Sequence, residues 1–274
     1  MPNSHFVSRF LTKRWEFGQR RLWYYDFDRK WIAHESSEKL FARRRGSSRQ
    51  MEQRLNGLVE TPLSKAINSL TGDSRLGKNE VQDWLVVRAL CVIFLLQAIR
   101  PSDQEPHRLE LEKILRADDK TIDQLAATFY NTYAMVQLQA HPHAPLFYPS
   151  NGVFIVPVDV QRPSLHFILA IPLTPRDLVV SIPRDIDIPH ALETLTAGKG
   201  GYLTNTSVGT AARRVVIHPD IVENYDQTEM AAAIEQNRAR NSDNLHCMCA
   251  QEDLTVLRNS FFSLRNRRRG PRCV

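Results

Sequence analysis

The sequence predicts a soluble α+β protein. Its helical N-terminal half surrounds one buried central helix and packs with a mainly antiparallel sheet from the C-terminal half and an N-terminal hairpin. Three observations predict this class: an apolar run at residues 84–96, proline-bounded apolar runs between residues 153 and 183, and two aromatic-rich runs within residues 21–32. Because the long helical segments come before most of the strands, α+β is favoured over alternating parallel βα units.

The composition allows a sizeable core without disulfides or metals. A chain of 274 residues buries roughly three quarters of its unfolded surface. Four scattered cysteines do not suggest a disulfide framework. No early apolar run follows a basic start, so we expect no secretory signal and a cytoplasmic location. We expect one α+β domain over residues 1–264 and a basic, mobile tail over 265–274.

The charge is divided unevenly along the chain. The net charge is +6 overall, but residues 1–55 carry +7, residues 258–274 carry +6, and the remainder carries −7. A uniformly solvated surface does not require such a division. An anionic partner is the natural inference, although basic tails also serve solubility alone.

The N-terminal segment predicts a β-hairpin. Leu22–Tyr25 and Trp31-Ile32 flank an aspartate-rich segment at Asp26–Lys30, and aromatic residues favour strands while aspartates favour turns. Arginines and lysines interleave with these aromatics. Two interpretations stay open: a stacking platform for bases, or a hairpin that packs one face on the core.

A helix with a proline in it comes next. Apolar residues recur at three- and four-residue steps over residues 55–70. Pro62 removes a backbone donor within this pattern, so it predicts either a kink or a second helix capped by Thr61.

The apolar run then predicts the central helix, from Asn79 to Arg100. Asn79 is the expected N-cap, and Pro101 ends the helix by disfavouring helical geometry at the preceding residue. Because the helix is apolar on every face, we expect neighbours to surround it. Arg88 and the length of the run argue against a membrane span.

The rest of the chain changes from helical to strand-like periodicity. The further expected elements are helices over 106–115, 121–139 and 227–240, strands over 153–156, 165–171 and 178–182, a short helix capped by Asn205 or Thr206 that leads to Arg213-Arg214, and a strand or short helix over 254–264.

Common catalytic motifs are missing from the sequence. It has no phosphate-binding glycine loop, no Gly-x-Ser-x-Gly turn and no His-Glu-x-x-His helix, which argues against common nucleotide hydrolases, serine hydrolases and zinc proteases. His246-Cys247-Met248-Cys249 offers soft ligands, but structural zinc sites have two separated ligand pairs and the second is missing. We therefore predict no zinc site at this segment and assign no metal ligands.

Four positions stand out because each lies at an expected element boundary, where sites are usually built: the Ser150-Asn151 pair and the three candidate catalytic residues His5, Glu60 and Arg100. Together these three residues offer a base, a metal or proton partner, and a clamp for developing phosphate charge. The alternative is structural, since an arginine after a core helix can pair with a carboxylate and tie two elements together.

Several short segments carry a family resemblance that spans about the whole chain. They are Ser4–Leu11, the hairpin Arg21–Ile32, the helix with Glu60, Arg100-Pro101, Pro149–Gly152, Ile171–Pro175, and Asn205 with Ala212-Arg213. Their order resembles an uncharacterised bacterial family, domain of unknown function 4238, which implies a setting sometimes near mobile or defence genes and no established activity. Ser8 departs from the family's proline, and Ser150-Asn151 lacks its aspartate. If that aspartate serves chemistry in relatives, this member is weak or inactive.

The leading hypothesis is binding of RNA or DNA through the basic N-terminal region, the loop at 43–49 and the C-terminal tail, with salt-dependent phosphate contacts. The expected contact residues are Arg9, Lys13, Arg14, Arg20, Arg21, Arg43, Arg44, Arg45, Arg49, Arg267, Arg268 and Arg269. Phosphodiesterase activity of His5, Glu60 and Arg100, with Mg²⁺ as its cofactor, is a further expectation. The alternatives are a non-enzymatic protein that binds an acidic protein partner and a small-molecule hydrolase.

Overall fold

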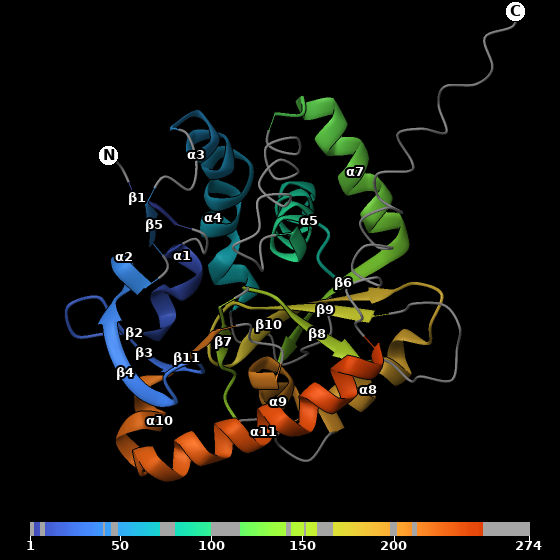
Figure 1. Ribbon diagram of the computed structural model, residues 1–274. Coiled ribbons are helices and arrows are strands. Elements are labelled where there is room, and N and C mark those ends of the chain that lie inside the picture. Colours follow the sequence, from blue (N-terminus) through green and yellow to red (C-terminus); the bar gives the residue numbers. More distant parts are fainter. Residues whose placement is uncertain are drawn as a thin grey trace, which may run out of the picture.

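A computed structural model (Figure 1) describes residues 3–5, 9–40, 42–44, 49–71, 80–99, 116–140, 144–150, 152–157, 167–197, 202–209 and 213–248. The helical elements are α1 (Arg9–Thr12), η1 (Lys13–Trp15), α2 (Ser37–Leu40), α3 (Arg49–Leu55), η2 (Asn56–Glu60), α4 (Thr61–Leu70), α5 (Trp84–Ile99), α7 (Asp119–Thr132), α8 (Ile188–Ala197), α9 (Tyr202–Gly209), α10 (Pro219–Asn224) and α11 (Gln227–Met248). The strands are β1 (Asn3–His5), β2 (Glu16–Phe17), β3 (Arg21–Asp26), β4 (Trp31–Ser36), β5 (Ala42–Arg44), β6 (Tyr133–Gln139), β7 (Tyr148–Pro149), β8 (Phe154–Pro157), β9 (Phe167–Pro172), β10 (Asp177–Pro183) and β11 (Arg214–Ile217).

The strands form three sheets. One has the order β6-β10-β9-β8, a second has the order β2-β3-β11-β7 with β4 paired to β3, and β1 pairs with β5. Every strand pair among the described residues is antiparallel. Helices and antiparallel sheets together confirm the predicted α+β class.

The sheet β6-β10-β9-β8 is covered on both faces. Val179 of β10 joins the cluster of buried residues that contains Leu90 of α5, while its neighbour Val180 joins a second cluster with Leu192 of α8 and Leu203 of α9. Successive strand residues point to opposite faces, so the strand reads as a continuous apolar run. In Figure 1 the helices α4, α5 and α7 lie on one side of this sheet and α8, α9 and α11 on the other.

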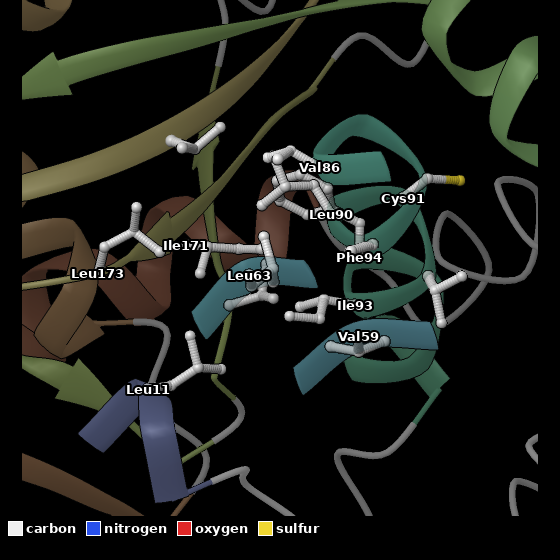
Figure 2. Packing of buried hydrophobic residues seen from close by; sticks show 14 of the residues in the cluster. Leu11, Val59, Leu63, Val86, Leu90, Cys91, Ile93, Phe94, Ile171 and Leu173 are labelled. Atoms are coloured by element: carbon white, nitrogen blue, oxygen red, sulfur yellow. The ribbon is translucent and has the colours of Figure 1, made fainter. Parts of the chain in front are cut away.

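The central helix is α5, and the described residues from Val86 to Phe94 are buried except for Arg88. Figure 2 shows Val59 and Leu63, from the neighbouring helical segment, beside the α5 residues of this cluster. The apolar character therefore reflects burial, as predicted. Trp84 and Leu85 are the exceptions, because 39% and 57% of their surfaces are exposed at the start of the helix.

The predicted start of this helix is wrong. α5 begins at Trp84, and the Asp83 carboxylate accepts hydrogen bonds from the backbone N–H groups of Leu85 and Val86 at 2.9 and 3.4 Å. Asp83 is thus the N-cap, in place of Asn79, which lies outside the described residues. The intervening chain is extended: the Val81 N–H donates to the Met135 carbonyl at 2.8 Å.

Pro62 does not break its helix. α3, η2 and α4 follow one another without a gap, and the Thr61 N–H donates to the Asn56 carbonyl five residues back. Proline lacks an N–H and its ring displaces the carbonyl four residues before it, so a wider, π-helical turn accommodates it. Thr61 therefore lies inside the helix and does not cap a new one.

β6 and β11 were not predicted as strands, and neither were the short strands β1, β2, β5 and β7. The expected helix over 121–139 ends at Thr132, and residues 133–139 instead form β6, which pairs along β10. Arg214 begins β11, which pairs with both β3 and β7. Asn205 and Thr206 lie inside α9, one turn from its start, so neither caps it. Long-range pairing overrides a short apolar segment whose own periodicity is ambiguous.

The predicted hairpin forms as β3 and β4, with Trp23 opposite His34 and Tyr25 opposite Ile32. Its Tyr24 faces the cluster around α5, whereas Tyr25 faces α10 and α11. α11 is fastened to the hairpin by the Tyr25 hydroxyl, which donates to Glu235 at 2.7 Å. Burial, followed by this hydrogen bond, raises the pKa of Tyr25.

No helix within the described residues is both long enough and apolar enough to cross a membrane.

Candidate nucleic-acid interface

Two basic residues, Lys13 and Arg14, lie at the surface because residues near them on both sides are buried. Leu11 and Trp15 are almost fully buried in α1 and η1, so Lys13 and Arg14 between them lie exposed on the surface. Beyond β2 the chain turns through residues 18–20 with positive φ at Gly18 and Arg20, at 47° and 58°. This tight turn leaves the side chains of Arg20 and Arg21 exposed as well.

These four residues, Lys13, Arg14, Arg20 and Arg21, are called the N-terminal basic surface below. Lys13 and Arg20 line a hollow of about 400 Å³ together with Phe10 and Glu16. Arg20 also approaches Glu38 at 3.4 Å, with both side chains more than half exposed. Such an exposed pair is weak and is easily exchanged for a contact with an anion.

Arg14 lines a second hollow, larger and separate in its lining, with a volume of about 740 Å³. It gathers side chains from segments far apart in the sequence. Besides Arg14, the polar and aromatic lining includes Arg176, His218, Asp220, Asn224 and Tyr225. We call it the Arg14–Tyr225 groove.

The turn between β9 and β10 forms part of the groove's lining. Asp177 there is buried, and its carboxylate accepts hydrogen bonds from the Thr174 hydroxyl at 2.6 Å and the Gln139 amide at 3.2 Å. The Thr174 hydroxyl in turn accepts from the backbone N–H groups of Arg176 and Asp177. This network fixes the turn from which Arg176 extends, and it satisfies the buried carboxylate.

Aromatic residues near the basic surface divide into two groups. Trp15, Tyr24, Tyr25 and Phe27 are buried, so for these four the core interpretation holds. Phe17 and Trp23 are only half-buried, and their rings stack at 5.3 Å with a 9° angle between planes. The exposed His34 ring meets the Trp23 ring edge-on at 4.7 Å.

The described ion pair with the most buried carboxylate is structural. Arg214 of β11 donates from Nε to the Asp26 carboxylate at 2.9 Å and from Nη1 to the Leu40 carbonyl at 3.3 Å. Burial acts to raise the pKa of Asp26, but the hydrogen bond from Arg214, backbone donors at Arg29 and Asp28 and the charge of Arg214 outweigh it. The pKa of Asp26 therefore lies below its ordinary value.

The three predicted catalytic residues are not brought together by what the structure describes. Glu60 is half-buried at the end of the π-helical turn, and no described residue forms a hydrogen bond or ion pair with its carboxylate. His5 pairs through its backbone with Ala42 in the β1–β5 sheet. The His5 side chain and Arg100 lie outside the described residues, so the proposed constellation stays a prediction.

The other predicted contact residues are described unevenly. Arg49 is exposed at the start of α3. The backbones of Arg9, Arg43 and Arg44 lie in α1 and β5, without described side chains. Outside the described residues lie Arg45, Arg267, Arg268 and Arg269.

Ser150, the described residue of the Ser150-Asn151 pair, has structural hydrogen-bond partners. Its buried hydroxyl accepts hydrogen bonds from the backbone N–H groups of Arg213 and Arg214, both at 3.2 Å. It therefore holds the start of β11 beside β7. Asn151 lies outside the described residues.

Sequence reasoning missed Arg176 and Tyr225. Each lies in a short turn or at a helix end, without a motif around it. A weak signal existed at Thr174–Asp177, because a Thr-Pro-Arg-Asp turn between two strands exposes its arginine. No cluster of three or more potential metal ligands occurs in the described part of the chain.

Comparison with known proteins finds no family model, curated protein or solved structure that matches this chain.

Proposed function

We propose that the protein binds nucleic acid, with single strands as its preferred form, through the N-terminal basic surface. The observation that carries the proposal is the exposure of the four cations of this surface, two of which, Lys13 and Arg20, line a hollow with Phe10 and Glu16. Exposed lysines and arginines bind the phosphates of nucleic acid favourably, because each contact releases counterions that are condensed on the nucleic acid.

The half-buried aromatic pair supports the choice of nucleic acid over other polyanions. Phe17 and Trp23 lie on β2 and β3, the strands on either side of the turn that carries Arg20. Base stacking on aromatic side chains contributes about 1–3 kcal/mol per base, and unpaired bases are free to stack. A duplex would present phosphates but no accessible ring faces, so we propose single strands.

The test is fluorescence anisotropy with labelled 20-residue RNA and DNA strands. We expect the Lys13→Ala/Arg20→Ala double variant to bind about tenfold more weakly, because two phosphate contacts are lost. The matched control is Arg116→Ala/Lys120→Ala, which removes one arginine and one lysine that are exposed before and at the start of α7, away from α1 and β2 in Figure 1. Equal loss in both variants would contradict the proposal.

An acidic protein partner is the rival use of the same cations. Polyglutamate, added at the same charge concentration as a competing strand, discriminates between the two. Nucleic-acid binding predicts that polyglutamate displaces the labelled strand far less well than unlabelled RNA, since it offers no rings for Phe17 and Trp23. Equal displacement would favour the acidic partner.

Cleavage of the bound strand is the extension of this proposal, with Glu60 as the residue to change. Incubation with Mg²⁺ should shorten the labelled strand in the wild-type protein and leave it intact with Glu60→Gln. Intact strands in both samples would limit the protein to binding.

A further inference from the structure

The Arg14–Tyr225 groove contains cations, an aromatic ring and a polar wall that come from three separate parts of the chain. Arg14 comes from η1, Arg176 from the β9–β10 turn, and His218 to Tyr225 from α10 and the residues that flank it. Its volume of about 740 Å³ lies within the range of pockets that bind small molecules.

The two arginines retain donors for an anion. Arg14 uses one of its guanidinium nitrogens to reach Asn68 at 3.2 Å, in an exposed hydrogen bond. Arg176 is exposed, and no described residue forms a hydrogen bond or ion pair with its guanidinium. Guanidinium groups favour phosphate because their planar donors match its oxygens.

Two carboxylates, Asp177 and Asp220, line the groove, but neighbouring groups reduce their repulsion of a bound anion. Asp177 is buried and accepts hydrogen bonds from Thr174 and Gln139, so its charge is spread over those donors. Asp220 is exposed, and its carboxylate lies 3.5 Å from Nδ1 of His218. In the neutral imidazole this nitrogen accepts a hydrogen bond from the backbone N–H of Asp220, so His218 caps the start of α10.

Tyr225 supplies an exposed ring to the lining of the groove. It ends α10, where its N–H donates to the Ile221 carbonyl at 3.2 Å, and 64% of its surface is exposed. Only four large apolar side chains among the described residues are exposed, and Tyr225 is the most exposed of them. An exposed ring beside two arginines is an arrangement that stacks a nucleobase and holds its phosphate.

We infer that the Arg14–Tyr225 groove binds one nucleotide, with its phosphate between Arg14 and Arg176 and its base against Tyr225. The inference rests on the proposed function for its choice of ligand, and it adds a mononucleotide subsite to the N-terminal basic surface. Arg14 belongs to both, so a strand that crosses the surface near Lys13 reaches the groove through it.

The test measures the binding of uridine monophosphate to the full chain by saturation-transfer NMR. We expect binding that weakens about tenfold in Arg176→Gln and in Tyr225→Ala, whereas Tyr225→Phe keeps it within twofold because the ring remains. Lys120→Gln is the control for the loss of one exposed positive charge. Absence of wild-type binding, or equal affinity in all variants, would overturn the inference.

Titration of a uridine 20-mer with the same proteins separates this inference from the proposed function. If Lys13→Ala/Arg20→Ala weakens strand binding while Arg176→Gln and Tyr225→Ala do not, the groove is excluded and the basic surface stands. If the wild-type protein binds the mononucleotide at the groove but not the strand, the proposed function fails and the groove stands.

Discussion

Asp26 is a buried residue whose negative charge stabilises the fold. Its side chain is only 3% exposed, and Arg214 and two backbone N–H groups bind it. Asp26→Asn should lower the free energy of unfolding by about 2 kcal/mol, because Arg214 keeps a partly buried charge without its partner. Urea denaturation measures this loss, and Asp28→Asn, at an exposed pair with Arg213, is the control with little expected effect.

The same carboxylate predicts how stability depends on pH. Its folded pKa lies below the ordinary value of 3.8, so its contribution is fully present above that value and is lost as the pH falls through the folded pKa. The difference in unfolding free energy between wild type and Asp26→Asn should therefore be constant near neutral pH and shrink below pH 3.8. A difference that grows on acidification would contradict this assignment.

A substitution at Ser150 tests whether this residue serves structure. Its hydroxyl accepts from two backbone N–H groups at the start of β11. Ser150→Ala should cost about 1–2 kcal/mol of unfolding free energy, since those donors lose a buried acceptor. The affinity of this variant for single-stranded nucleic acid should stay within twofold of wild type. A large loss of affinity in a stably folded variant would instead place Ser150 in the site.

At the scale of elements, the capping of α5 gives a direct comparison. Asp83 accepts from the first free N–H groups of the helix, so Asp83→Ala should lower the unfolding free energy by about 1 kcal/mol. Asn79→Ala should have almost no effect, because the helix begins at Trp84. Thermal denaturation of the two variants decides between the observed cap and the one that the sequence suggested.

Elements with strong local patterns could be predicted, and those that depend on distant partners could not. The central helix and the hairpin follow from apolar runs and aromatic residues that decide their own conformation. β6 and β11 are strands because β10 and β3 lie beside them to accept and donate ladder hydrogen bonds. A single sequence does not show those neighbours, so residues 133–139 fit a helix equally well.

The candidate site shows the same division at the scale of the whole molecule. The basic residues of the N-terminal surface were predicted from charge counting, because a cluster in sequence stays a cluster on a short exposed segment. Arg176 and Tyr225 line one groove with Arg14 only when the β6-β10-β9-β8 and β2-β3-β11-β7 sheets have folded. No spacing in the sequence encodes that meeting, which is why the groove was missed.

The most direct test of nucleic-acid binding by the N-terminal basic surface is the salt dependence of affinity for a single strand. We expect the logarithm of the binding constant to fall linearly with the logarithm of salt concentration, with a slope of about −0.7 per phosphate contact. The slope of Lys13→Ala/Arg20→Ala should be shallower by about 1.4, because two contacts are lost, while that of Arg116→Ala/Lys120→Ala should equal wild type. A slope unchanged by loss of Lys13 and Arg20 would show that these residues do not contact phosphate and would contradict the proposal.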